Sequence, residues 1–440
     1  MSVNKTKEPA YRRTEHPDAQ WFGNAGLGLF LHWGISSVKG EGNLSWDMMD
    51  PLPGSLQKTL DIHGPQGPSS VTTPAEYFAE AANFRADKYN PLTWLTAAKK
   101  AGFTYAVLTT KHHDGFALWP SAYGDFNTRN YLGGRDLVRE FVEACRATGL
   151  KIGFYYSPPD WYYQRHHMSF RYGGKVKSPD LPDLGLHHEP ITLPVLTPAE
   201  QKAWDDKYRA YLRGQIEELL TGYGKIDILW FDSVIWSDVG SGVITNERVR
   251  DWQPGIVINP RNGEGDYETP EGIFPAQRPS GWWELCHVWN EGGWSYRSHE
   301  IYKPTGWVTS ELARVRAWGG NFLLNMGPDS HGELPPVAYQ RMKELAGWMA
   351  QSRESVEGTT SGPWPEQCNV PVTCRDSAWY LHVSWVWDQP VVLSGIKAPK
   401  AVLLLRTGEA WPYDFADGTL RFKIPLHRLT LLGQVVKVVW

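Results

Sequence analysis

The stretch YGKIDILWFDSVIW, residues 223–236, has the composition of a buried parallel strand that ends in an acid. Ile226, Ile228 and Leu229 are residues that such a strand favours. Asp232 then follows in a run that is apolar on both sides. Burying an ionised carboxylate is costly unless a partner or a function compensates. Asp232 is therefore predicted either to cap a helix or pair with a buried Arg, or to serve as a nucleophile, general base or metal ligand.

Around this stretch, the chain alternates strand-like and helix-like segments, an order that indicates parallel strands joined by helical crossovers. The strand-like segments are 26–34, 103–116, 150–161, 225–233, 255–261 and 321–328. The helix-like segments are 91–102, 135–149, 199–224, 309–320 and 335–354.

Both an open doubly wound sheet and a closed barrel fit this order. Polar residues at the C-terminal ends of the predicted strands favour the barrel, because there these ends converge on one mouth. They are His32, the group 111–114, Tyr155 with Tyr156, Asp232, Arg261 and Asn325. We therefore predict an α/β fold, a (β/α)8-like TIM barrel, over residues 1–355.

The remaining segment, residues 356–440, has a different character. It consists of short β-runs separated by Gly, Pro and Asp, and it shows no helical period. This pattern predicts a small C-terminal antiparallel β-sandwich.

The composition limits the classes of partner that the protein is expected to bind. A formal net charge of −4 and a pI near 6.4 provide no basic field for nucleic acid or a membrane surface. The 23 Trp and 20 Tyr suit either core packing or a site that stacks on sugar rings. The four cysteines lack metal spacing, and no leader or long apolar run is visible. We expect free thiols and a cytoplasmic protein, with a homo-oligomer left open.

A second polar cluster, TTKHHDGFALW at 109–119, contains His112 and His113. Adjacent residues of an extended chain point to opposite sides, so the pair is not expected to bind one metal ion, and no other metal motif completes a site. Hydrogen bonding to a polyhydroxylated ligand fits this cluster better. The alternative is a loop whose histidines are satisfied by the backbone.

A third polar region, residues 259–297, is rich in Gly, Pro and Trp. Its acids are Glu264, Asp266, Glu268, Glu271, Glu284 and Glu291. Two facing carboxyl groups are the minimum machinery of glycoside hydrolysis, so one of these acids is a candidate partner for Asp232. The alternative is that all of them are solvated. The chain has no phosphate-binding loop and no GxSxG nucleophile elbow.

Several blocks of the chain resemble the signature blocks of alpha-L-fucosidases of glycoside hydrolase family 29. In order along residues 20–350 they are LGLFLHWGISSV, YAVLTTKHHDGFALWPS, GLKIGFYYSPPDW, ILWFD, TPE, WELC, SYR and GGNFLLNMGPDSHGELPP. The resemblance implies a retaining exo-glycosidase that removes terminal alpha-linked L-fucose from oligosaccharides or glycoconjugates. It also implies a barrel with an accessory sandwich, and no metal or cofactor.

The resemblance further implies site residues. The acid of the ILWFD block, Asp232, matches the nucleophile. The acid/base matches Glu271 of the TPE block, with Glu284 of the WELC block as the alternative. Of Tyr155 and Tyr156, one is expected to point inward, and we favour Tyr156. The other implied sugar contacts are His32, Trp46, His112, His113, Trp230, Arg261 and Trp294.

One position departs from the pattern. Many relatives carry a Glu-Trp pair after the HWG motif, whereas this chain has Ser45 before Trp46. The lost carboxylate implies a shift in sugar or linkage preference. Two other functions remain open: a glycosidase for another L-sugar of the same configuration, such as an alpha-L-galactoside, and a catalytically silent carbohydrate-binding barrel.

Overall fold

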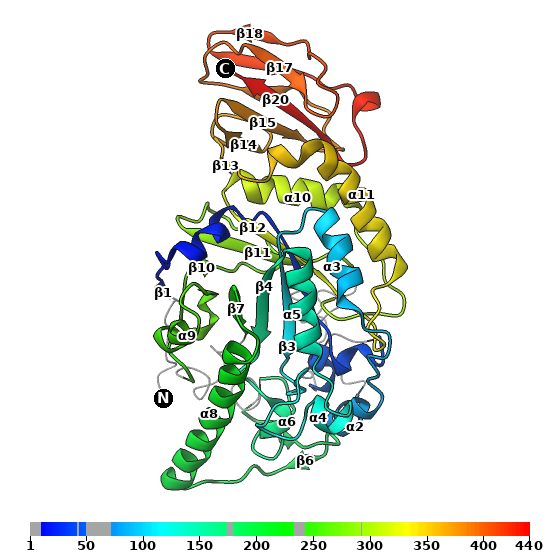
Figure 1. Ribbon diagram of the computed structural model, residues 1–440, viewed down its shortest axis with the longest axis vertical. Coiled ribbons are helices and arrows are strands. Elements are labelled where there is room, and N and C mark those ends of the chain that lie inside the picture. Colours follow the sequence, from blue (N-terminus) through cyan, green and yellow to red (C-terminus); the bar gives the residue numbers. More distant parts are fainter. Residues whose placement is uncertain (1–9, 42–43, 50–71, 174–178, 233–242, 292) are drawn as a thin grey trace.

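The computed structural model describes residues 10–41, 44–49, 72–173, 179–232, 243–291 and 293–440. The last part of the opening stretch, residues 233–236, lies outside this range. The described chain forms a parallel barrel and, at one end of the molecule, a β-sandwich (Figure 1). Both the predicted barrel and the predicted sandwich are confirmed.

Eight strands form the barrel, and every neighbouring pair in the sheet is parallel. In spatial order they are β10 (Tyr267–Glu268), β11 (Trp282–Val288), β12 (Asn321–Met326), β2 (Leu27–Leu31), β3 (Tyr105–Lys111), β4 (Lys151–Tyr156), β7 (Ile228–Phe231) and β8 (Val257–Ile258). Their residues are buried almost throughout, as parallel strands covered on both faces require.

The sheet nearly closes between β8 and β10. The Asp266 N–H donates to the Ile258 carbonyl at 2.8 Å, and the Asp266 carboxylate accepts from the Ile258 N–H at 2.7 Å. A side chain therefore replaces part of the ladder at this seam. It joins the two sheet edges, so that all strand ends face one mouth.

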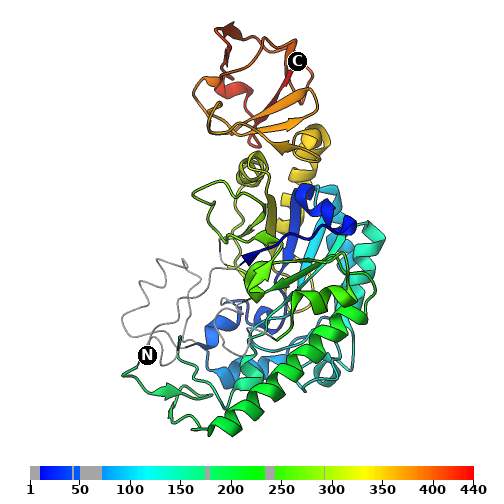
Figure 2. The ribbon, with the colours of Figure 1, turned by 90° about the vertical axis from the view of Figure 1, so that its left-hand side faces the viewer.

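Helices cover the outside of the barrel (Figures 1 and 2). They are α3 (Pro91–Lys100), α5 (Leu137–Thr148), α8 (Pro198–Thr221), α9 (Asn246–Trp252), α10 (Thr305–Ala317) and α11 (Pro336–Ser352). Local signals set their ends: Thr197 and Glu200 form a capping box before α8, and Gly149 ends α5 in the left-handed conformation. Figure 2 shows α8 running along the side of the barrel. No described helix has both the length and the apolar character needed to cross a membrane.

The barrel interior is packed with large side chains, among them Phe30, Tyr105, Trp230 and Leu323. Gly28 of β2 makes room for one of them. A Cβ atom at Gly28 would lie 2.1 Å from the Tyr105 ring. Tyr105 can therefore extend across the barrel only because residue 28 has no side chain.

The C-terminal sandwich has two antiparallel sheets with a core of its own. One sheet contains β13 (Thr360–Ser361), β14 (Val372–Arg375), β15 (Ala378–Val383), β20 (Gln434–Val439) and β17 (Ala401–Leu404). The other contains β16 (Val391–Leu393), β19 (Thr419–Phe422) and β18 (Asp414–Ala416). The Gly362 N–H donates to the Ala317 carbonyl, so the sandwich lies beside the N-terminal end of β12, away from the mouth.

Short elements complete the described chain, most of them in connections around the barrel. They are β1 (Ala10–Tyr11), η1 (Pro17–Asn24), η2 (Ile35–Ser37), η3 (Leu44–Met48), α2 (Pro74–Ala79), η5 (Glu80–Ala82), α4 (Thr128–Tyr131), α6 (Trp161–Gln164), β5 (Asp183–Leu184), β6 (Pro190–Ile191), η7 (Pro260–Asn262), β9 (Glu264–Gly265), η8 (Arg353–Ser355) and η9 (Leu426–Arg428).

Candidate active site

Asp232 lies directly after β7, at the mouth of the barrel. Its backbone N–H donates to the Tyr156 carbonyl at 3.1 Å. The Asn259 side chain accepts from the Phe231 N–H and donates to the Phe231 carbonyl, both at 2.8 Å. Neighbouring strands thus fix the backbone that carries the acid, and the carboxylate keeps a defined direction.

Both oxygens of the Asp232 carboxylate accept hydrogen bonds. Arg261 donates to Oδ1 at 2.6 Å, and the Tyr155 hydroxyl donates to Oδ2 at 2.6 Å. The side chain is 13% exposed. Burial alone would raise the pKa of Asp232, but the Arg261 charge and the Tyr155 hydroxyl bring it below its ordinary value. Asp232 is therefore an ionised carboxylate at neutral pH.

A second carboxyl group shares the same guanidinium. Arg261 donates through Nη2 to Glu271 Oε2 at 2.6 Å, while its Nη1 donates to Asp232. The Glu271 side chain is 44% exposed. Its loop is tied to β11, because the Gly272 N–H donates to the Cys286 carbonyl and the Cys286 N–H donates to the Pro270 carbonyl. One arginine thus brings together the two acids that the sequence put forward first.

Three histidines lie on the Asp232 side of this pair, and a polar neighbour orients each ring. His32 Nδ1 contacts Asn325 Oδ1 at 2.7 Å, and the Asn325 amide donates to the Trp294 carbonyl. The amide therefore requires a hydrogen on His32 Nδ1. His112 Nδ1 lies 2.8 Å from the Ser45 hydroxyl.

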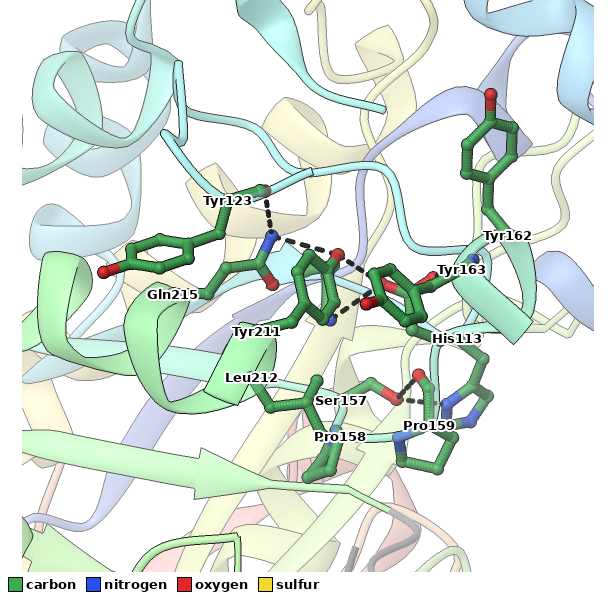
Figure 3. Close-up of polar contacts among 12 residues, drawn as sticks. His113, Tyr123, Ser157, Pro158, Pro159, Tyr162, Tyr163, Tyr211, Leu212 and Gln215 are labelled. Carbon is green, nitrogen blue, oxygen red and sulfur yellow. Dashed lines mark hydrogen bonds and ion pairs between the residues drawn. The ribbon is translucent and has the colours of Figure 1, made fainter. Parts of the chain in front are cut away.

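His113 is oriented by Ser157, which lies between the ring and the Pro159 carbonyl (Figure 3). Because the single hydroxyl hydrogen goes to Pro159, Ser157 accepts from His113 Nδ1. Nε2 of His113 lies 3.5 Å from Asp232 Oδ2. Burial lowers the pKa values of both His32 and His113 to about 4, so both rings are neutral at pH 7.

The expected divergence of His112 and His113 is wrong. Their ring centroids lie 4.2 Å apart. The reason is that β3 ends at Lys111 after a register shift, and the chain then turns, with the Gly115 N–H donating to the His112 carbonyl. Strand alternation therefore no longer applies to the pair.

This proximity raises the question of a metal ion. Ligand atoms of His112, His113 and Asp232 all lie within 4.8 Å of one another, close enough to share a cation. Arg261, however, places a positive charge on one oxygen of Asp232, which opposes a second cation there. Neutral imidazoles beside a carboxylate and a guanidinium suit hydroxyl groups better.

The inward tyrosine is Tyr155, and the expectation for Tyr156 is wrong. Tyr155 stacks on the His112 ring, with centroids 5.6 Å apart, and its hydroxyl reaches Asp232. Tyr156 points outward, where its hydroxyl donates to Gln215 of α8 and accepts from Lys111. Because β4 is buried on both faces, the sequence does not show which of its alternating residues point into the barrel.

Glu284 and Trp230 lie deeper than expected. Glu284 is fully buried near the start of β11, where it accepts from the Tyr105 hydroxyl at 2.5 Å and the Trp230 indole N–H at 3.1 Å. Trp230 is 2% exposed and lies under the Arg261 guanidinium, 4.5 Å from the ring centroid. Glu284 therefore points into the barrel interior, and Trp230 offers little surface to a sugar.

Trp46 and Trp294 are half-buried. The Trp46 ring lies 5.4 Å from the His113 ring, and the Trp294 ring lies 5.0 Å from the His32 ring. The two indoles thus flank the histidines from two separate segments, so the site combines apolar ring surface with polar atoms.

The chain matches the family model described as Alpha-L-fucosidase over residues 2–354. It belongs to the alpha-L-fucosidase family. Rat tissue alpha-L-fucosidase is 28% identical over 428 residues, which cover 92% of this chain and 85% of the rat protein. Human tissue alpha-L-fucosidase is 26% identical over 83% of this chain and 73% of its own length.

Solved fucosidase structures share the fold. Alpha-L-fucosidase isoenzyme 1 from Paenibacillus thiaminolyticus superposes with a TM-score of 0.75 at 27% identity, covering 96% of this chain and 98% of its own. The Thermotoga maritima alpha-fucosidase bound to a mechanism-based inhibitor gives 0.71 at 26% identity, covering 97% and 98%. The similarity extends through the sandwich.

Within this fucosidase fold, several positioning groups were missed by the sequence reading. Ser157 and Asn259 are common residue types whose partners, His113 and the end of β7, come from other parts of the chain. The only sequence signal for them was their place toward the C-terminal end of a predicted strand-like segment. Asn325 gave the same signal, but its contact with His32 could not be read from it.

Proposed function

We propose that this chain is a retaining exo-alpha-L-fucosidase that releases terminal alpha-linked L-fucose from oligosaccharides or glycoconjugates. The observation that carries the proposal is the pair of carboxyl groups held by one guanidinium, Arg261, at the mouth of a fucosidase-family barrel. Retaining glycosidases use two carboxyl groups about 5–5.5 Å apart. Contact with one planar guanidinium is compatible with such a short separation.

In this mechanism Asp232 is the nucleophile and Glu271 is the acid/base. Asp232 attacks the anomeric carbon and forms a glycosyl ester, while Glu271 protonates the departing glycosidic oxygen. Glu271 then deprotonates the water that cleaves the ester. The low pKa of Asp232 and the exposure of Glu271 toward solvent support these roles. Donating a proton requires Glu271 to give up its contact with Arg261.

The remaining residues of the mouth are assigned to sugar recognition. His32, His112 and His113 offer ring nitrogens to hydroxyl groups of the sugar. Trp46 and Trp294 provide apolar surface beside them. A position where Trp294 lies against His32 and Phe30 suits the C5 methyl group of fucose better than the hydroxymethyl group of L-galactose.

The experiment is a direct assay with aryl alpha-L-fucoside and aryl alpha-L-galactoside, followed by NMR of the first product. We expect higher kcat/KM for the fucoside, with alpha-L-fucose formed before the anomers equilibrate. Faster hydrolysis of the galactoside would reassign the sugar. No turnover of either glycoside above the blank would favour the silent carbohydrate-binding barrel.

The same proposal includes a catalytic unit of residues 1–355, an accessory unit of residues 356–440 and a cytoplasmic location. All four cysteines are unpaired, which supports a reducing compartment. Limited proteolysis would test the division into units at residue 355, and fractionation of the producing cell would test the cytoplasmic location.

A further inference from the structure

A second buried carboxyl group lies beneath the mouth of the barrel. Glu284 is 0% exposed, and its two oxygens accept from Tyr105 of β3 and Trp230 of β7. No Lys or Arg in the described part of the chain forms an ion pair with it. A buried acid without a cation is costly, so its two hydrogen bonds call for an explanation.

Trp230 links this acid to the mouth. Its indole N–H donates to Glu284, and its ring lies under the Arg261 guanidinium. The Tyr155 ring also stacks on Trp230, with centroids 5.6 Å apart and planes at 15°. Anchoring the N–H stops the indole from rotating, and a fixed indole supports Arg261 and Tyr155 together.

Those two residues are the groups that hold Asp232. Arg261 binds Oδ1 and Tyr155 binds Oδ2, each at 2.6 Å. A continuous set of contacts therefore leads from Glu284 through Trp230 to both oxygens of the carboxylate.

We infer that Glu284 is a positioning residue for the nucleophile: it fixes the Trp230 indole, which in turn fixes the two donors to Asp232. The inference rests on the proposed role of Asp232. It assigns Glu284 a task other than proton donation, because both of its oxygens are engaged inside the barrel. Burial raises the pKa of Glu284 to about 7, and either protonation state can accept the indole N–H.

The test is a double-mutant cycle on kcat/KM with aryl alpha-L-fucosides. Glu284→Leu removes both acceptors, and Trp230→Phe removes the indole N–H. We expect each variant to lower kcat/KM by about 30-fold or more, as expected when a buried hydrogen bond is lost. The double variant should have a kcat/KM no more than about 3-fold below that of the worse single variant. Glu284→Gln keeps an acceptor for Trp230 and should stay within about 5-fold of wild type.

Trp283→Phe is the matched control. Trp283 precedes Glu284 on β11, is equally buried, and donates its indole N–H outward to the Trp318 carbonyl. Because it does not contact Glu284 in the barrel interior, its effect should add to that of Glu284→Leu. Melting temperatures of all variants separate a loss of folding from a loss of positioning.

Two further readouts distinguish positioning from acid/base catalysis. A positioning role lowers kcat/KM equally for aryl fucosides with good and poor leaving groups. It also moves the acidic limb of the pH profile to higher pH, because Asp232 loses its donors. A merely structural role of Glu284 would change neither kcat/KM nor the position of the acidic limb of the pH profile.

Additive losses in the Glu284 and Trp230 cycle would overturn the inference. The inference would also be overturned if Glu284→Gln lowered kcat/KM as much as Glu284→Leu and if this loss grew as the leaving group became poorer. That result would make Glu284 the general acid. If Glu284→Leu does not fold, wild-type kcat/KM in Trp230→Phe would overturn the inference. Inactive wild-type protein would instead refute the proposed function.

Discussion

Two adjacent layers of one barrel each hold a buried carboxyl group, and the two groups have opposite properties. Asp232, at the mouth, contacts the Arg261 cation, and its pKa lies below the ordinary value. Glu284, deeper in the barrel, accepts from the neutral donors Tyr105 and Trp230, and burial raises its pKa to about 7.

The comparison shows what makes an acid in a barrel reactive. Both groups are largely buried, and each accepts hydrogen bonds on both oxygens, so burial and hydrogen bonding alone do not distinguish them. The cation does, because only a nearby positive charge outweighs the desolvation of an ionised carboxylate. The cation also lies at the open end of the barrel, where a substrate can enter.

Removing the mouth acid tests the comparison most severely. Asp232→Ala should lower turnover of aryl fucosides by roughly 10⁴-fold or more, because no other group can form the glycosyl ester. Azide should restore part of the activity and yield a β-fucosyl azide, identified by NMR. Near-normal activity without azide would show that the nucleophile lies elsewhere.

Removing the second mouth acid should produce a loss that depends on the substrate. Glu271→Ala should slow fucosides with poor leaving groups by about 10²–10⁴-fold, the usual range for general acid catalysis, and activated aryl fucosides far less. A series of aryl fucosides of graded leaving-group pKa measures this. If Glu284→Ala gives the graded loss and Glu271→Ala does not, the two roles must be exchanged.

Replacing the cation should make Asp232 resemble Glu284. Arg261→Met leaves the carboxylate buried with a neutral donor, and kcat/KM should fall by about 10²–10³-fold, corresponding to a broken buried ion pair. The wild-type cation lowers the pKa of Asp232, so its removal raises that pKa. The acidic limb of the pH profile should therefore move to higher pH, and an unmoved limb would contradict the role of Arg261.

The smallest expected effect separates neighbouring tyrosines. Tyr155→Phe removes a donor to Asp232 Oδ2 and should lower kcat/KM by about 10–100-fold, the range for a hydrogen bond to a charged group. Tyr156→Phe, the matched control, removes contacts to Gln215 and Lys111 on the outside of the barrel and should leave kcat/KM within about 3-fold of wild type. Equal effects would remove the distinction between the two faces of β4.

The sequence was sufficient for the layout of the molecule. Alternating strands and helices predicted the barrel, and polar residues after strands placed His32, His113, Asp232 and Arg261 at one mouth. These features depend on local order along the chain. The short β-runs after residue 356 predicted the sandwich on the same basis.

The depth and direction of individual side chains could not be predicted. Parallel strands covered on both faces are apolar throughout, so the sequence does not show which phase points inward, and Tyr156 was chosen over Tyr155. Glu284 gave no sign that it lies a layer below the mouth. That depth depends on the register between β11 and β12, which pairs Glu284 with Asn321.

Gly28 has an evolutionary consequence. A Cβ atom there would overlap the Tyr105 ring, and the Tyr105 hydroxyl is one of the two donors to Glu284. Positions 28 and 105 should therefore change together during descent. A relative with a side chain at position 28 must carry a smaller residue at position 105, and it must then satisfy its buried acid by another donor or lose the acid as well.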